Sequence, residues 1–224
     1  MKEIPSGSIH AIVTDPPYGS DNSHMRAQNI VEATKFENDD EGPWRELMPQ
    51  FFTEAARILD PKESAILCFG EGGGKKRISN RVSDWMSSYL EFVTTLVWDK
   101  GMPGLGWNYR RSHEFIFVGH RKGSKLRWFD RGGAAKTVIR FPRLVNPDEE
   151  QHPTPKPVNL MEYLIRNHTQ KGDIVCDPFS GGGSTLVAAK RLGRRFIGFD
   201  LDPRWVLLSN KRIDQEAEQG ELFG

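Results

Sequence analysis

The part of the sequence that most limits the possible folds lies between residues 173 and 202. An apolar run, Asp173-Ile-Val-Cys-Asp177, is followed by the glycine-rich turn Pro-Phe-Ser-Gly-Gly-Gly-Ser-Thr185, and helical spacing of apolar residues continues to Leu192. A second apolar run, Arg195-Phe-Ile-Gly-Phe-Asp200, comes next. Strand, turn, helix and strand in this order predict a βαβ unit with parallel strands.

The same unit has the features of a nucleoside-cofactor pocket. Three successive glycines, residues 181 to 183, allow the backbone to approach a ligand closely. The N-terminus of the following helix offers unpaired N–H groups, and Asp200 can accept hydrogen bonds from ribose hydroxyls. The turn contains neither Gly-x-Gly-x-x-Gly nor Gly-Lys-Ser/Thr. The pattern therefore favours a nucleoside cofactor over a dinucleotide or a P-loop triphosphate, although the glycines alone would also suit an ordinary tight turn.

The rest of the chain shows the same alternation of apolar runs and helical patterns. We expect one α/β domain, residues 1–224, with a mostly parallel sheet and helices on both faces. Strands are expected at 9–14, 65–69, 92–98 and 114–118, and helices at 44–59, 75–89, 158–167 and about 203–218. The strands at 92–98 and 114–118 should form a hairpin-like pair. Residues 19–42 are polar without a sustained period, so a mobile loop is expected there.

A catalytic stretch, Asp15-Pro16-Pro17-Tyr18, follows the first expected strand. An amino group conjugated to a ring is a poor nucleophile, because its lone pair is delocalised. A carboxylate and a backbone carbonyl that both accept from the NH2 group can hold its nitrogen in a nucleophilic geometry. Asp15 offers the carboxylate and Pro16 the carbonyl, and successive prolines keep this acceptor site rigid. Tyr18 offers a flat face for an unstacked base.

Charge and composition narrow the partners. Basic residues dominate between residues 110 and 143, which fits a phosphate-binding surface as well as a simply solvated one. We expect a short basic insert at about 121–145. The candidates for phosphate contacts are Arg110, Arg111, Arg121, Lys122, Lys125, Arg127 and Lys136.

Other residue types exclude several classes of site. Cys68 and Cys176 lie in strand-like runs and are expected to be buried free thiols. The histidines show no metal-ligand spacing, so no metal site is expected. No apolar stretch is long enough to span a membrane and no signal peptide is present, which predicts a cytoplasmic protein.

Taken together, these stretches resemble the DNA N6-adenine and N4-cytosine amino-methyltransferases. Asp15-Pro-Pro-Tyr18 is similar to the catalytic tetrapeptide of that family, and the turn at 177–185 to its cofactor motif. His152-Pro-Thr-Pro-Lys-Pro157 and Leu96-Val-Trp-Asp-Lys100 with His113-Glu114 resemble two further family segments. The tetrapeptide precedes the basic segment and the cofactor turn, which is the β-class order. The family's ribose-binding acid is usually glutamate, where this chain has Asp200.

The resemblance implies a Rossmann-like fold and direct in-line transfer of a methyl group from S-adenosylmethionine to an exocyclic amino group. It also implies a target base flipped out of double-stranded DNA. The basic insert at about 121–145 would then be the target-recognition element, and the basic candidates named above would be DNA-binding residues. Asp15, Pro16 and Pro17 would orient the amino group, and Tyr18 would stack on the base. The residues implied at the cofactor are Asp177, Phe179, Ser180, Gly181, Gly183, Ser184, Thr185, Asp200 and, near its methionine end, Lys156.

Several alternatives stay open at this point. Aspartate at the first position of the tetrapeptide favours adenine, whereas family members acting on cytosine more often have serine there. An RNA base or a glutamine amide is another possible substrate, but asparagine and a different motif order are more usual for such enzymes. Family members usually begin with a strand ending in Gly-Asp, which this chain, starting at Met1, does not show; a non-catalytic binding relative is therefore a further alternative. The short insert would read few base pairs alone, so a homodimer is expected.

Overall fold

The computed structural model describes residues 1–17, 41–71, 78–104, 108–130, 132, 135–143 and 155–222. Tyr18, most of the loop expected at 19–42 and the first three residues of the His152–Pro157 segment lie outside these ranges. The elements are β1 (Ala11–Thr14), α1 (Glu41–Ile58), β2 (Glu63–Glu71), α2 (Ile78–Tyr89), β3 (Glu91–Asp99), β4 (His113–His120), β5 (Lys125–Leu126), β6 (Val138–Arg140), α3 (Val158–His168), β7 (Ile174–Asp177), α4 (Ser184–Arg191), β8 (Arg195–Gly198) and α5 (Pro203–Leu222).

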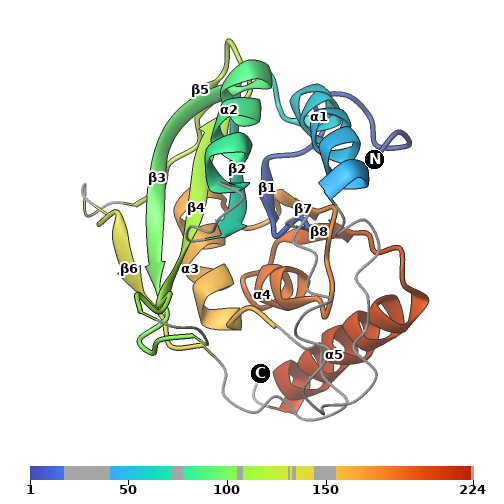
Figure 1. Cartoon of the computed structure of the whole chain (residues 1–224). Coiled ribbons are helices and arrows are strands. Elements are labelled where there is room, and N and C mark those ends of the chain that lie inside the picture. Colours follow the sequence, from blue (N-terminus) through green and yellow to red (C-terminus); the bar gives the residue numbers. More distant parts are fainter. Residues whose placement is uncertain are drawn as a thin grey trace.

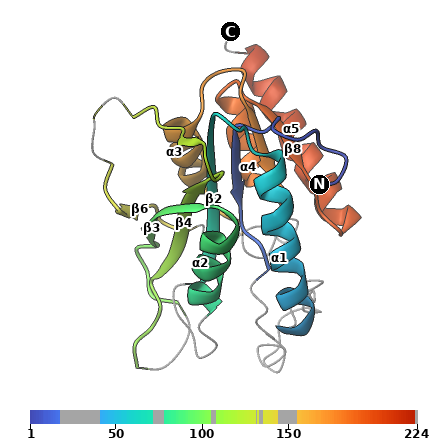
Figure 2. The same cartoon turned by 90° about the horizontal axis from the view of Figure 1, so that it is seen from above.

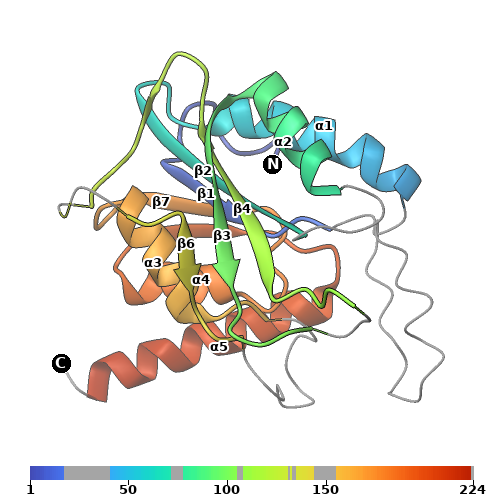
Figure 3. The same ribbon diagram turned by 60° about the vertical axis from the view of Figure 1, so that its left-hand side comes forward.

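The strands form one mixed sheet between two layers of helices, as the sequence predicts (Figure 1). Its order is β6-β3-β4-β2-β1-β7-β8, and β5 pairs with the start of β2. Helices α1 and α2 cover one face, while α3, α4 and α5 lie on the other; Figures 2 and 3 both separate these two groups. β4 is antiparallel to both of its neighbours, which confirms the expected hairpin with β3.

The core follows the two-residue alternation of the strands. Ile12 of β1 faces the cluster that contains Trp44 and Phe52 of α1. The neighbouring Val13 joins the opposite cluster with Leu164 of α3. Because successive side chains of a strand point to opposite faces, a strand that is buried on both sides must be apolar throughout. This explains why the central strands read as continuous apolar runs.

The order of the strands reverses between β1 and β7. β1 pairs in parallel with β2 on one side and with β7 on the other. The chain proceeds from β1 to β2 in one direction along the sheet and from β7 to β8 in the opposite direction. In open α/β sheets, ligands bind at the carboxyl ends of the strands where the order reverses in this way. The carboxyl ends of β1 and β7 are therefore the expected location of the site.

Two short strands were not predicted from the sequence. β5 pairs with β2 at Glu63↔Lys125, at the amino end of β2. β6 pairs in parallel with β3 at Asp99↔Arg140, at the carboxyl end of β3. The basic segment thus runs from one edge of the strands to the other and takes part in the pairing at both.

Candidate active site

Asp15 lies directly after β1, at the carboxyl edge of the sheet. β1 ends at Thr14, and Pro16 and Pro17 cannot donate to a further ladder. Pro16 is buried, while the Asp15 side chain keeps 27% of its surface exposed. The carboxylate is therefore accessible, on a backbone that the prolines hold in one conformation. Tyr18 lies outside the described residues.

Asp177 ends β7, the strand next to β1, and is linked to it directly. The Thr14 hydroxyl donates a hydrogen bond of 2.6 Å to Asp177 Oδ1, and the Phe179 N–H donates to the same oxygen at 3.2 Å. Thr185 Oγ1 lies 3.4 Å from the carbonyl oxygen of Val13, also in β1. The Thr14–Asp177 bond joins the ends of β1 and β7, and the Thr185 contact joins the start of α4 to β1. The Asp15 and Asp177 stretches therefore lie side by side in the candidate site.

Burial dominates the electrostatics of Asp177. It raises the pKa of this carboxyl to about 6, and the charge of Asp15 acts in the same direction. Hydrogen bonds from Thr14, Thr185 and the Phe179 N–H oppose the shift without cancelling it. A carboxylate held in this way favours a cationic ligand group, which would restore its ordinary pKa.

The glycine-rich turn is held against the end of β8. The Ser180 N–H and hydroxyl both donate to the Phe199 carbonyl, at 2.8 and 3.0 Å. Asp200 Oδ2 accepts from the Gly181 N–H at 2.9 Å, and its Oδ1 accepts from the Asp202 N–H at 2.9 Å. The acid expected to bind ribose therefore also fixes the shape of the turn.

Gly183 is required for two reasons. Its φ is +77°, and a Cβ built there would lie 2.1 Å from Ser209 Oγ of α5. It also forms the N-cap of α4 without any side-chain cap bond, so the first turn of this helix, which starts with the buried residues Ser184 and Thr185, presents backbone N–H groups to the turn. A close-fitting backbone cradle of this kind suits the polar end of a nucleoside cofactor.

Lys156 occupies a position that the sequence did not predict. Its ammonium donates to Asp15 Oδ2 and lies 3.5 Å from Glu114 Oε2. Lys100 Nζ donates to the other oxygen of Glu114 at 3.1 Å. Lys156 therefore contacts the catalytic carboxylate, and Glu114 and Lys100 belong to the same cluster. The sequence alone gives no sign of this cluster, because Lys156 and Asp15 are 141 positions apart.

The predicted DNA-binding residues separate into two groups. Arg110 and Arg111 are exposed in the connection between β3 and β4, which returns to the sheet at Asp99↔His113, on the carboxyl edge. The Arg110 Nε donates to the Gly104 carbonyl at 2.7 Å. Lys136 is exposed just before β6. Arg110 and Arg111 therefore lie beyond the carboxyl end of β3. Lys136 lies before β6, at the outer edge of the sheet.

The other four lie at the amino edge, away from Asp15. Arg121 Nη1 donates to the Leu59 carbonyl at 2.8 Å, and Lys122 Nζ donates to the Ser88 carbonyl at 2.7 Å. Arg127 Nη2 donates to Asp173 Oδ2 at 2.6 Å. Lys125 lies in β5, opposite Glu63. Hydrogen bonds within the fold thus use Arg121, Lys122 and Arg127, and the structure does not bring these four residues to the candidate active site.

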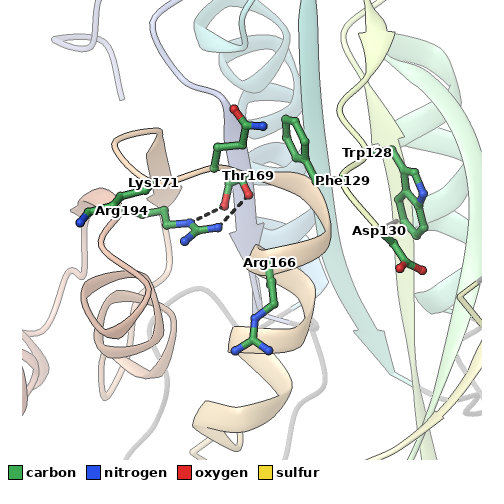
Figure 4. A pocket seen from close by; sticks show the side chains of 8 residues that line it. Trp128, Phe129, Asp130, Arg166, Thr169, Lys171 and Arg194 are labelled. Atoms are coloured by element: carbon green, nitrogen blue, oxygen red, sulfur yellow. Dashed lines mark hydrogen bonds between the residues drawn. The ribbon is translucent and has the colours of Figure 1, made fainter. Parts of the chain in front are cut away.

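A cavity of about 480 Å³ also lies at this amino edge (Figure 4). It is lined by Trp128, Phe129, Asp130, Arg166, Thr169, Gln170, Lys171 and Arg194. Arg194 Nη2 and Nε donate to the Thr169 carbonyl and hydroxyl at 2.8 and 3.0 Å. The Arg194 guanidinium is therefore hydrogen-bonded to the residue that follows α3. The residues that line the cavity are separate from those at the carboxyl ends of β1 and β7.

Within the described ranges, no group of three or more potential ligands could hold a metal ion. No helix in this part of the chain is long and apolar enough to cross a membrane. Cys68 and Cys176 are both free and buried, as predicted.

Sequence comparisons give a consistent result. The sequence model of a DNA methylase family, N6_N4_Mtase, matches residues 9–211. The Type II methyltransferase M2.LlaDCHI of Lactococcus lactis subsp. cremoris is 43% identical over 242 residues, covering 98% of this chain and 87% of the relative. The Type II methyltransferase M.HhaII of Haemophilus parahaemolyticus is 27% identical over 217 residues, covering 90% and 86%.

Solved structures show the same fold. The M1.HpyAVI–SAM complex has a TM-score of 0.71 and 22% identity, covering 95% of this chain and 91% of the other. The cytosine-N4-specific PvuII DNA methyltransferase has a TM-score of 0.74 and 16% identity, covering 97% and 86%. At these identities the likeness shows a common architecture, and the fold is that of the S-adenosylmethionine-dependent methyltransferases.

Proposed function

This chain belongs to the N6/N4 DNA methylase family and is an S-adenosylmethionine-dependent DNA methyltransferase, and we propose that it methylates N6 of adenine in double-stranded DNA. The observation that carries the proposal is that the Asp15 and Asp177 stretches lie side by side at the carboxyl ends of β1 and β7. The Thr14–Asp177 hydrogen bond of 2.6 Å fixes the tetrapeptide strand to the strand that leads into the cofactor turn. Acceptors for an amino group and a cradle for a cofactor therefore lie side by side.

Asp15 and the carbonyl of Pro16 would each accept a hydrogen bond from the target amino group. This draws the nitrogen out of conjugation, so that its lone pair becomes available. The nitrogen would then form its new N–CH3 bond with the methyl group that S-adenosylmethionine supplies in exchange for its S–CH3 bond, and the proton lost from the nitrogen would pass to solvent. Pro17 keeps the tetrapeptide rigid, and Tyr18 would stack on the flipped base.

The residues at the carboxyl ends of β7 and β8 fit S-adenosylmethionine, which supplies the methyl group when bound. The cofactor is cationic at sulfur and at its amino group. Asp15 and Asp177 are neighbouring carboxylates at the carboxyl ends of β1 and β7, and they would attract these cations. Asp200 would accept from ribose hydroxyls. The turn from Phe179 and Ser180 through Gly181 and Gly183 to Ser184 and Thr185 would hold the rest of the molecule, with the backbone N–H groups at the start of α4 as donors.

DNA would bind across the carboxyl edge. We propose Arg110, Arg111 and Lys136 as phosphate contacts, since all three are basic and exposed. Tyr109, next to them, is fully exposed and follows Asn108, which has a left-handed φ of 58°. Because this surface is short, we propose that the protein acts as a homodimer, so that two such surfaces cover one recognition site. We further propose that it has a role in a restriction–modification system.

Adenine is proposed on the basis of the aspartate that starts the tetrapeptide. To test the proposal, the protein is incubated with tritiated S-adenosylmethionine and unmethylated genomic DNA, and the digested nucleosides are separated. We expect label in N6-methyladenine, its loss in Asp15→Asn, and its retention in Asp84→Asn, a matched exposed aspartate on α2. Label in N4-methylcytosine would move the substrate to cytosine. Cofactor binding with no transfer by the wild-type protein would favour the non-catalytic relative.

A further inference from the structure

We propose that Lys156 is a positioning residue that keeps the Asp15 carboxylate ionised and oriented, and that Glu114 and Lys100 hold Lys156 in place for this purpose. The inference rests on the proposed function in one respect, because Asp15 is the acceptor for the amino group. It assigns to Lys156 a role different from the contact with the methionine end of the cofactor that the family resemblance implies.

The four charged groups form one continuous, alternating chain. Lys156 Nζ contacts Asp15 Oδ2 and lies 3.5 Å from Glu114 Oε2, and Lys100 Nζ lies 3.1 Å from Glu114 Oε1. The Lys156 side chain is 10% exposed and the Glu114 and Lys100 side chains are each 17% exposed. Ion pairs that are this well covered are screened far less than surface pairs, so each charge influences its neighbours.

Three separate elements fix the position of this cluster. Glu114 is in β4, where it pairs with Glu71 of β2, and Lys100 follows β3 directly. Pro155 and Pro157 flank Lys156 and restrict its backbone. Its ammonium lies 5.4 Å from the centre of the Phe69 ring of β2. A side chain held by two carboxylates and an aromatic ring has little freedom to move with the substrate, as a positioning role requires.

The electrostatic balance depends on Lys156. Burial would lower the pKa of Lys156, but Asp15 and Glu114 outweigh it and the pKa is raised. Burial would raise the pKa of Glu114, but Lys156 and Lys100 together lower it. The other titratable groups near Asp15 are the Asp177 carboxyl and the Cys68 thiol. Removing the Lys156 ammonium would take away a cation that contacts Asp15 and leave the nearby Asp177 carboxyl in place.

Two roles for Lys156 can be separated by experiment, because they act on different quantities. A positioning residue changes the pKa and orientation of Asp15 and leaves cofactor affinity nearly unchanged. A cofactor ligand changes the dissociation constant of S-adenosylmethionine and leaves the pKa of Asp15 unchanged. Lys156→Met removes the charge at similar length, Lys156→Arg keeps it, and Lys171→Met is the matched control on the exposed surface.

The direct measurement is the titration of Asp15 in protein labelled with 13C at aspartate carboxyls, with Asp15→Asn to identify the signal. We expect Lys156→Met to raise the pKa of Asp15 by at least one unit and Lys156→Arg and Lys171→Met to leave it in place. Calorimetry should give dissociation constants for S-adenosylmethionine within twofold of the wild type. An unchanged pKa of Asp15 in Lys156→Met, or a tenfold weaker cofactor affinity in its place, would overturn the inference.

Turnover supplies a second, independent readout. In Lys156→Met we expect kcat to fall at least tenfold at neutral pH, with its acidic limb moved to higher pH. If Lys156→Met does not fold, Glu114→Gln is the milder variant, with a smaller shift in the same direction; no shift in a folded Glu114→Gln would count against the cluster. The carboxyl titration needs no DNA, so its result stands even if the labelled base is cytosine.

Discussion

Replacing Asp177 with asparagine should make the protein more stable at neutral pH while weakening cofactor binding. Burial raises the pKa of this carboxyl from 3.8 to about 6. A shift of about 2 pKa units corresponds to about 3 kcal/mol of unfavourable free energy for the charged form. An asparagine amide keeps the acceptor for Thr14 but needs partners for its own N–H groups, so we expect a net gain of about 1.5 kcal/mol.

The pH dependence follows from the sign of the shift. The folded protein binds the Asp177 proton more tightly than the unfolded chain does, so this group costs no stability well below pH 4 and its cost grows as the pH rises to about 6. The cost of the charged carboxyl falls to about half at pH 5, whereas the cost of the asparagine N–H groups does not depend on pH. The advantage of Asp177→Asn should therefore be complete at pH 7.5 and nearly vanish at pH 5. At about 2–4 °C per kcal/mol for a chain of this size, Tm should rise by about 3–6 °C at pH 7.5.

Thermal unfolding of both proteins at the two pH values, with calorimetric titration of S-adenosylmethionine, tests this reasoning. The matched control is Asp173→Asn just before the other end of β7, where the carboxylate accepts from Arg127 at 2.6 Å and from the Gln170 N–H at 2.7 Å. That variant should lose about 2 kcal/mol at pH 7.5. A lower Tm for Asp177→Asn at pH 7.5, or a gain that does not change with pH, would refute the account of Asp177.

Further predictions concern the turn and the two edges of the sheet. Gly183→Ala should destabilise the fold by about 2–4 kcal/mol in urea unfolding, because its Cβ would lie 2.1 Å from Ser209 Oγ at a positive φ; unchanged stability would contradict the close packing of Gly183 against α5. Asp200→Ala should raise the KM for S-adenosylmethionine at least tenfold with a smaller effect on kcat, and an effect on kcat alone would argue against ribose binding. Arg111→Ala should weaken DNA binding in a filter-binding assay and reduce its salt dependence by about one phosphate contact. Arg127→Ala should cost about 3 kcal/mol of stability and leave DNA affinity unchanged. Weaker DNA binding in Arg127→Ala but not in Arg111→Ala would place the DNA surface at the amino edge of the sheet.

Much of the fold was predictable because its elements carry strong local patterns. The strand runs at residues 9–14 and 173–177 and the helix at 158–167 each differ from the observed bounds by only a residue or two. β5 and β6 were not predicted, since strands of two and three residues are too short to show an alternation. β5 pairs with the start of β2, before β2 pairs with β1 and β4, and β6 pairs with the outer side of β3. No local pattern reveals either partner.

The site was predictable to the extent that it is local in sequence. The tetrapeptide at Asp15 and the turn from Asp177 are continuous, so their chemistry could be inferred from neighbouring residues. The contact of Lys156 with Asp15 was not predictable, because it depends on how the segment before α3 crosses the end of β2. Charge density alone also did not reveal that Arg121 donates to a backbone carbonyl and Arg127 to a carboxylate within the fold.

The identity of the methylated nucleoside tests the central claim most directly. Unmethylated DNA is incubated with the protein and S-adenosylmethionine carrying a trideuterated methyl group, and the digested nucleosides are analysed by mass spectrometry. We expect the deuterated label in N6-methyl-2′-deoxyadenosine and its absence when Asp15→Asn replaces the wild type. Deuterated label confined to N4-methyl-2′-deoxycytidine, or label in adenine that persists in Asp15→Asn, would contradict the account.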